Sequence, residues 1–396
     1  MTITTSEQTY AEELLAGIDV VAYKADIDPS ADEDTGVIGR HTFDTFDRAG
    51  YMNFVAASEF GGPDVAPVAG MRILERLSAI DASLGWTAMV MNAHLKDLHF
   101  FPQEVAARLY VDGPPKIAGQ GAPTGRAQRV DGGYQISGRW SYGSALPFAD
   151  YVVGAAMVMD GDVPELMPSG QPNALLFITP IKNVTIGGNW DVLGLKATAS
   201  LDYSMNNVFV PADFAVDDFF GARMQWGGRS ALLTFVGWLM WDHTVVELGI
   251  GRRILDELAE YSRKSSPKRG MLAESPVFQT EFARAEADFR SARAWVYEVW
   301  HDLQDTIDAG RSPSRAQLTN ARAALLHVHD ANEKNAMMAF RQAGGASLRP
   351  GSLQKVVRDS MAAGQHLLLS TASLVDCGRD YLGLADHMTW SLYNLI

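Results

Sequence analysis

The sequence has little cysteine and no excess of positive charge. Cys377 is the single cysteine among 396 residues, so the chain cannot form an internal disulfide. Lys and Arg number 33 against 47 Asp and Glu, which gives a formal net charge of −14. A balance this acidic leaves no basic face for a phosphate backbone, so we expect no nucleic-acid partner.

Long apolar runs and nucleotide-binding fingerprints are also missing. No run approaches the roughly 18 apolar residues of a membrane span, and the acidic N-terminus lacks the basic start and apolar core of a signal peptide. Neither a GxGxxG fingerprint nor a P-loop stands out. We therefore expect no reduction step that uses a nicotinamide cofactor bound to this chain. We expect a cytoplasmic protein without a membrane partner.

The signals for secondary structure change twice along the chain. In residues 8–110, apolar residues recur at helical spacing. From about residue 116 to 220, Gly, Pro and Asn punctuate short runs rich in Val, Ile, Phe and Tyr, which is typical of antiparallel strands. Helical spacing then returns, with helices expected at about 276–309, 313–343 and 352–375. We therefore expect three units, at residues 1–113, 114–224 and 225–396.

One stretch, residues 131–151, combines strand signals with an unusual set of small residues. It reads DGGYQISGRWSYGSALPFADY: a tight turn, an alternating strand, a run of small and hydroxyl residues, and a new strand from Tyr151. The residues alone leave two interpretations open. The run is either an irregular hairpin loop or a segment whose backbone contacts a ligand.

This stretch resembles the central β-domain of the acyl-CoA dehydrogenase superfamily. More narrowly, SGRWSYGS at residues 137–144 resembles the two-component flavin monooxygenases that include the 4-hydroxyphenylacetate and steroid-ring hydroxylases. Residues 191–200 and 208–211 match the family's next turn and the exit of its β-domain, in the right order. The resemblance implies an α+β fold with an N-terminal helical domain, a central antiparallel β-domain and a C-terminal four-helix bundle, and it implies a homotetramer.

The resemblance also implies which residues hold a flavin. Ser144 lies where a family Ser or Thr donates a hydrogen bond toward flavin N5, with Tyr142 in the same motif. Thr198 and Ser200 match the turn that flanks the flavin, and Gln120 and Gly121 match the loop along its pyrimidine side. The positions that match the phosphate end, which is held partly by a neighbouring subunit, are Arg263, Gln279, Gly344 and Gly345.

The carboxylate base of the family's dehydrogenases is missing. After Arg358-Asp359, the position of the usual Glu is held by Leu367, and the alternative position aligns near Leu239. Asp242 is close enough that a shifted alignment would supply a carboxylate. Loss of both bases argues against the α,β-dehydrogenation of an acyl thioester.

Histidines stand in place of the base. His366 and His94 match two histidines of the monooxygenase branch, and imidazole is suited to proton transfer near neutral pH. Both are predicted to act on the substrate, with Trp238 and Trp241 as walls of its pocket. The alternative for each is a structural role in the core.

A further pair of histidines, His327 and His329, superficially suggests a metal site. Residues two apart do not share a helical face, so we expect a solvated helix surface and no metal.

These observations predict the oxygenase component of a two-component flavin monooxygenase. Reduced FMN or FAD from a separate reductase would react with O₂ to give a C4a-hydroperoxide, which oxygenates an apolar small molecule, aromatic or bearing a heteroatom. Two alternatives stay open: a flavin dehydrogenase with an unusual base, and a non-catalytic interaction protein that has kept the fold.

Overall fold

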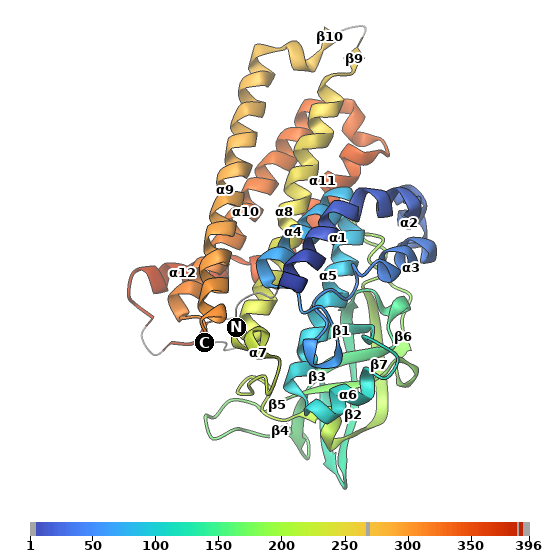
Figure 1. The fold of residues 1–396 in the computed structure, drawn as a ribbon, viewed down its shortest axis with the longest axis vertical. Coiled ribbons are helices and arrows are strands. Elements are labelled where there is room, and N and C mark those ends of the chain that lie inside the picture. The colour runs from blue at the N-terminus through green and yellow to red at the C-terminus, as the bar shows by residue number, and fades with distance from the viewer. Residues whose placement is uncertain (1–4, 267–269, 386–387, 391–396) are drawn as a thin grey trace.

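The protein consists of a sheet at one end and a group of long helices at the other (Figure 1). This arrangement comes from a computed structural model, which describes residues 5–266, 270–385 and 388–390. Within the described residues, no helix is both long and apolar enough to cross a membrane.

Six helices precede the sheet. They are α1 (Thr5–Ala25), α2 (Pro29–Thr35), α3 (Arg40–Arg48), α4 (Pro67–Ile80), α5 (Ala82–Asp97) and α6 (Gln103–Leu109). Helix α5 begins where it does because the Asp81 carboxylate accepts hydrogen bonds from the N–H groups of Ser83 and Leu84, at 2.9 and 3.0 Å. Such an N-cap satisfies backbone donors that the first helical turn leaves unpaired.

The sheet has eight strands in the order β6-β7-β2-β1-β3-β5-β8, with β4 pairing on β3. The strands are β1 (Ile117–Val130), β2 (Gly133–Gly143), β3 (Tyr151–Asp160), β4 (Val163–Pro164), β5 (Ala174–Pro180), β6 (Thr185–Ile186), β7 (Leu201–Pro211) and β8 (Ala215–Val216). The expectation of a purely antiparallel sheet is wrong for one pair. Strands β1 and β3 are parallel, because the chain leaves β2, crosses over a short 3₁₀ turn and returns on the far side of β1.

Strand β2 also differs from the sequence expectation, because it does not stop at the small residues. It continues to Gly143, and its irregularity appears as two register shifts against β7, near Gly138 and after Trp140. The strand therefore delivers Ser144 directly from its end, and the next residue, Ala145, has a φ of 62° that turns the chain away.

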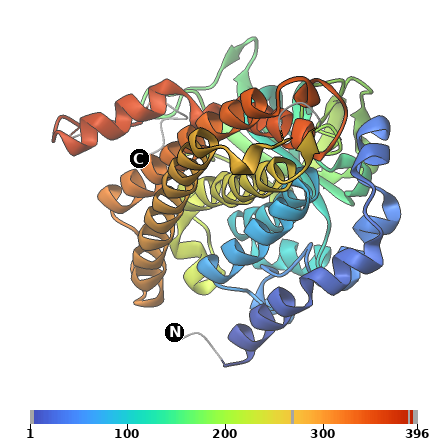
Figure 2. The ribbon, with the colours of Figure 1, turned by 90° about the horizontal axis from the view of Figure 1, so that it is seen from above.

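The last part of the chain is helical, apart from a small hairpin of β9 (Ser265–Ser266) and β10 (Gly270–Met271). The helices are α7 (Gly228–Leu232), α8 (Thr234–Ser262), α9 (Pro276–Asp308), α10 (Arg315–Ala343), α11 (Ser352–Ala363) and α12 (Thr371–Tyr381). Helix α8 packs against α10, α11 and α9 and also against α4 and α5 from the N-terminal part (Figures 1 and 2).

The expected helix at 352–375 is wrong, because it is two helices separated at Gly364. An added Cβ at Gly364 would lie 2.4 Å from the His329 ring, so the chain passes close to α10 there. The break leaves His366 in an extended conformation, with φ −68° and ψ 140°, outside any helix.

The two helical segments share one core, to which strands β1, β3 and β5 also contribute, and the sheet has a second core of its own. Leu74 of α4, Trp241 of α8 and Trp300 of α9 are all fully buried in the first core. Trp140 and Tyr203 stack at 5.4 Å in the second. The chain passes from helices to strands between α6 and β1, and back between β8 and α7.

Candidate active site

A chain of hydroxyl groups lies at the end of β2. The Ser144 hydroxyl oxygen is 2.7 Å from that of Ser200, which is 2.7 Å from that of Thr198. The Thr198 hydroxyl donates to the Leu195 carbonyl oxygen at 2.8 Å. At the other end, the Trp86 indole N–H donates to Ser144 at 2.9 Å. All three hydroxyl residues are buried.

The donors in this chain all point in one direction. A carbonyl oxygen only accepts, so the Thr198 hydroxyl donates its one hydrogen to the Leu195 carbonyl oxygen. It therefore accepts a hydrogen bond from Ser200. Ser200 in turn accepts from Ser144. The Ser144 oxygen therefore receives the Trp86 hydrogen, gives away its own, and keeps one free lone pair. A ligand at this position meets an acceptor, whereas the sequence analysis expected a donor.

Two histidines and Trp86 form an aromatic group beside the hydroxyl chain. The His243 ring lies edge-on to Trp86, with centroids 5.5 Å apart, and it stacks on His366 at 3.6 Å. The three residues come from α5, α8 and the segment after α11. The structure thus brings the predicted Ser144 and His366 together through Trp86 and His243.

Both imidazoles are held neutral by their surroundings. Burial lowers the pKa of His243 to about 4. Burial, and then the neighbouring His243, lowers the pKa of His366 well below its usual value. The Leu368 N–H donates to His366 Nδ1 at 3.3 Å, so the hydrogen of His366 is on Nε2. At neutral pH, His366 can donate a hydrogen bond from Nε2 but is not a ready proton acceptor.

Gln120 and Gly121 lie on a bulge of β1 next to this group. The pairing of β1 with β3 shifts between Gln120 and Gly125, and Gly119 bridges to Ser144 on the neighbouring strand. Gly119 has a φ of 137°, and an added Cβ would lie 1.8 Å from the Val153 carbonyl oxygen, so only glycine fits. An added Cβ at Gly121 would come within 3.8 Å of Phe235 of α8. The bulge therefore faces α8 from the sheet.

Tyr142 and His94 lie near the group without joining it by a direct contact in the described residues. The Tyr142 side chain is 71% exposed, and its ring meets Trp190 edge-on at 6.2 Å. His94 Nδ1 lies 2.7 Å from the Asp97 carboxylate, two helical turns beyond Trp86 on α5.

Trp238 and Trp241 lie in the helical core. The Trp241 indole donates to the Pro67 carbonyl oxygen at 2.9 Å and packs against Gly70 of α4. The Trp238 indole donates to the Ser230 carbonyl oxygen at 2.9 Å, and its ring meets Trp241 edge-on. These contacts favour the core-packing alternative for both tryptophans over a pocket wall.

The predicted phosphate-binding residues gather at the far end of the helices. Arg263 ends α8, twenty residues beyond His243, which is about 30 Å along the helix axis. The Tyr261 hydroxyl donates to the Ala343 carbonyl oxygen, which places the glycines 344–345 beside it. Gln279, in the first turn of α9, lies at the same end. Within one chain these residues are not brought to Ser144.

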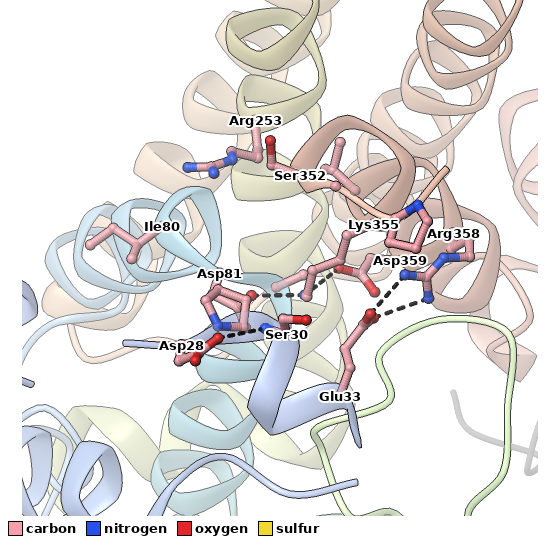
Figure 3. A pocket seen from close by; sticks show the side chains of 15 residues that line it. Asp28, Ser30, Glu33, Ile80, Asp81, Arg253, Ser352, Lys355, Arg358 and Asp359 are labelled. Atoms are coloured by element: carbon pink, nitrogen blue, oxygen red, sulfur yellow. Dashed lines mark hydrogen bonds and ion pairs between the residues drawn. The ribbon is translucent and has the colours of Figure 1, made fainter. Parts of the chain in front are cut away.

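A second polar region, around a cavity of about 350 Å³, lies between α2, α5 and α11 (Figure 3). The Lys355 ammonium contacts the carboxylates of Asp81 and Asp359 at 2.7 and 2.8 Å. Asp359 accepts from the Leu195 N–H at 2.7 Å, so it fixes the turn on which the hydroxyl chain ends. This region supports the site rather than forming a second one.

No group of three or more potential metal ligands occurs among the residues that the structure describes. The expected solvated surface at His327 and His329 is wrong for the second. His329 is largely buried, and its Nδ1 lies 3.2 Å from Glu247. Although burial lowers the pKa of His329, the Glu247 carboxylate raises it above the ordinary value overall.

The sequence analysis missed Trp86 and His243. No local motif marks Trp86, because its partner Ser144 is 58 residues away. His243 could have been found from its position, because it follows Asp242 on the helix where the second type of dehydrogenase base aligns, near Leu239.

Several known proteins are similar to this chain. Residues 242–371 match the family described as Acyl-CoA dehydrogenase, C-terminal domain. The indole-3-acetate monooxygenase of Pseudomonas putida is 29% identical over 364 residues, 87% of each chain. The crystal structure of the HsaA monooxygenase from M. tuberculosis superposes with a TM-score of 0.84 at 21% identity, covering 94% of this chain and 98% of the other. XiaF from Streptomyces sp., in complex with FADH2 and glycerol, gives 0.83 at 19% identity, covering 97% and 98%.

The chain is similar to flavin-dependent monooxygenases over most of its length and, over residues 242–371, to the C-terminal domain of the acyl-CoA dehydrogenases. Its fold is that of the acyl-CoA dehydrogenases. The residues at the end of β2 fit a flavin, which the similar XiaF structure holds as FADH2. Reduced flavin carries a hydrogen on N5, and the Ser144 oxygen offers a free lone pair. Oxidised flavin has only an acceptor at N5, which the hydrogen-bond pattern of Ser144 does not match.

The two positions predicted from the dehydrogenase pattern to hold a base are apolar in this chain. Leu367 follows His366 directly, and Leu239 lies on α8 one turn before His243. The surroundings of Asp242 do not favour the charged carboxylate that a base requires. Burial, and then the charge of Asp97, raises the pKa of Asp242 well above its usual value, so its protonated form is favoured.

Proposed function

We propose that the protein is the oxygenase component of a two-component system, which takes reduced flavin from a separate reductase and oxygenates an aromatic small molecule. The observation that carries the proposal is the one-way hydroxyl chain. It leaves Ser144 as an acceptor, suited to the N5 hydrogen of reduced FMN or FAD. The flavin supplies the activation of O₂ when it is bound, and the protein positions it and excludes water.

The residues around Ser144 have separate roles in this proposal. The bulge at Gln120 and Gly121 lies along the flavin ring, and Thr198 with Ser200 fixes the direction of the Ser144 hydroxyl. His366 presents its Nε2 hydrogen toward the substrate side. His94, held by Asp97, lies further along α5 and contributes at the distal end of the substrate.

The supporting comparison is with the indole-3-acetate monooxygenase, whose name specifies an aromatic substrate. An aromatic ring also suits the surfaces of Trp86, His243 and Phe235. We propose further that the protein is a cytoplasmic homotetramer with domains at residues 1–113, 114–224 and 225–396, the last providing a four-helix bundle for assembly. Arg263, Gln279, Gly344 and Gly345 would then hold the flavin phosphates of a neighbouring subunit.

The test is the preference for reduced flavin, compared between a variant of Ser144, which follows β2, and a variant of Ser137 within β2. Ser144→Ala should weaken the binding of reduced FMN or FAD by about 5- to 150-fold, equivalent to roughly 1–3 kcal/mol. It should affect oxidised flavin less. Ser137→Ala is the matched control, because Ser137 lies earlier on β2 and its hydroxyl accepts from the Asn207 N–H of β7. Anaerobic titration followed by fluorescence supplies the affinities.

Equal affinity for both redox states in the parent protein would contradict the proposal. So would oxidised flavin that stays bound through purification and is bleached anaerobically by an acyl-CoA, which is the behaviour of a dehydrogenase. Failure to bind flavin in any state would support a non-catalytic protein. Mixing the reduced-flavin complex with oxygen and an aromatic substrate, then measuring product against H₂O₂, tests the oxygenation itself.

A further inference from the structure

Two neighbouring residues of α8 each hold a buried polar atom without a partner among the described residues. These atoms are Oδ1 of Asp242 and Nε2 of His243. Buried polar atoms are nearly always hydrogen-bonded, because an unpaired one costs about 1–3 kcal/mol. Two such atoms on consecutive residues of α8, with His243 directly beside Trp86 and His366, point to a ligand that completes them.

The His243 nitrogen is an acceptor. The Leu239 carbonyl oxygen lies 3.3 Å from Nδ1 and only accepts, so Nδ1 carries the hydrogen and Nε2 carries the lone pair. The side chain is 7% exposed, and burial holds its pKa at about 4, so the ring stays neutral at pH 7. Only a hydrogen-bond donor, such as an N–H or O–H group, can pair with the lone pair of Nε2.

The surroundings of this acceptor are aromatic and apolar. Trp86 contacts one edge of His243 and His366 covers one face. Along α8, the partly exposed residues Phe235, Leu239 and Asp242 follow at spacings of four and three, so they share one face of the helix. Phe235 lies toward the β1 bulge, which is where the flavin ring is proposed to lie.

We propose that His243, with Asp242 beside it, determines substrate specificity by accepting a hydrogen bond from an N–H or O–H group of the aromatic substrate. This inference rests on the proposed function, because it assigns the substrate side of the same site. The family resemblance implied no role for His243, since His366 and His94 are the histidines it predicts to face the substrate, and it implied a role for Asp242 only as a dehydrogenase base. His243 is a specificity residue that contacts the substrate without changing its own protonation.

A buried acceptor discriminates strongly against a ligand that lacks the hydrogen. A site built to hydrogen-bond an N–H or O–H rejects the analogue without it, since the acceptor is then desolvated and unpaired. An isosteric pair of ligands, one with and one without the donor, therefore reveals the acceptor directly. Indole and benzothiophene form such a pair for N–H, and phenol and anisole form one for O–H.

The experiment measures binding of these four ligands to the purified full chain loaded with reduced FMN, by anaerobic calorimetry. At least one donor ligand should bind roughly tenfold or more tightly than its partner. The pair with the larger ratio identifies N–H or O–H as the recognised group. Ratios near one for both pairs, or no binding by any ligand at millimolar concentration, would overturn the proposal.

Variants locate the effect at His243. His243→Phe keeps an aromatic ring against Trp86 and removes the acceptor, so the ratio should fall to near one. His243→Gln offers an amide oxygen in its place and should restore part of the ratio. His327→Phe makes the same change at an exposed histidine of α10 and should leave the ratio as it is. An unchanged ratio in His243→Phe would show that another residue recognises the donor.

Binding and turnover separate this inference from the proposed function. If reduced flavin and O₂ give oxygenated product while the donor and donor-free ligands bind equally, the function stands and the His243 inference fails. If the donor preference is present but no ligand is oxygenated, the recognition site stands and the proposed function fails.

Discussion

At the scale of single residues, the site is organised by where each hydrogen atom lies. Trp86 donates to Ser144, Ser144 to Ser200, Ser200 to Thr198, and Thr198 to the Leu195 carbonyl oxygen. None of these three hydroxyl groups therefore has a hydrogen left to donate to a ligand. This arrangement requires each member to keep its partner. The buried imidazoles follow the same logic, because their tautomers are set by one backbone contact each.

His366 should affect the use of oxygen more than the binding of flavin. His366→Ala removes the Nε2 hydrogen on the substrate side and leaves the Ser144 chain intact. We expect H₂O₂ to rise relative to oxygenated product, with a loss of coupling of about 5-fold or more. Product and peroxide are quantified at the end of a single turnover. Normal coupling in His366→Ala, alongside normal coupling in Ser144→Ala, would show that both residues are structural.

The neutral histidines should make the protein less stable in mild acid. Burial lowers the pKa of His243 to about 4 and that of His99 to about 3, whereas an unfolded histidine titrates near 6.5. Between these limits the unfolded state binds more protons. The free energy of unfolding therefore falls as the pH drops from about 6.5 toward 4, by up to roughly 1.4 kcal/mol per pH unit for each group.

Urea unfolding at pH 7, 6 and 5 measures this dependence. His243→Gln should reduce the slope between pH 6 and 5, because the amide does not titrate. His327→Gln, at an exposed position of α10, provides the comparison. A slope that is the same in His243→Gln as in the parent protein would contradict the neutral state of His243.

At the scale of elements, three segments from distant parts of the chain meet at Lys355. Its ammonium joins Asp81, which caps α5, to Asp359 of α11 (Figure 3). Asp359 in turn accepts a hydrogen bond from the Leu195 N–H, in the turn before β7. Leu195 and Ala199 have φ values of 51° and 45°, so that turn needs outside support.

Removing this ammonium should destabilise the fold and loosen the turn. Lys355→Met leaves two buried carboxylates without their cation, which costs about 3–5 kcal/mol. Lys264→Met is the matched control, because the Lys264–Glu260 pair at the end of α8 is exposed and such pairs contribute little. Thermal unfolding gives the stabilities, and hydrogen exchange at residues 195–200 reports on the turn. Equal effects of the two substitutions would contradict the supporting role.

The sequence predicted these elements better than it predicted their contacts. The turn at Gly132, the strand from Tyr151 and the end of α8 at Arg263 follow from local residue preferences, which act over a few residues. The parallel pairing of β1 with β3 and the break at Gly364 depend on packing between distant segments. Trp86 and His243 were missed for the same reason, since their roles exist only after α5, α8 and β2 have come together.

At the scale of the whole molecule, the predicted flavin site is divided between two places. Ser144 lies at the end of β2, and Arg263 lies about 30 Å along α8 from His243. If one flavin is held by both, the two residues come from different subunits. Light scattering that reports a tetramer would agree with this arrangement, and a monomer with full flavin affinity would contradict it.

Mixed oligomers test the division directly. Ser144→Ala and Arg263→Ala should each weaken reduced-flavin binding in a pure oligomer, the second through loss of charge-assisted bonds to phosphate. After the two variants are unfolded and refolded together, some sites combine an intact Ser144 with an intact Arg263. About a quarter of sites should then bind with parent affinity, by random mixing of equal amounts and two contributing subunits. Absence of any recovery would place both residues in one subunit's site.

The single core shared by the first and last helices affects how the chain is made. Helix α4 packs on α8, yet the ribosome completes α8 some 180 residues after α4, with the whole sheet in between. At 5–20 residues per second, the N-terminal helices wait on the order of 10–40 seconds for their partner. The sheet, with a core of its own, is free to fold during that interval. We therefore expect synthesis to pass through a state in which the middle of the protein is folded and its beginning still exposes apolar surface to chaperones.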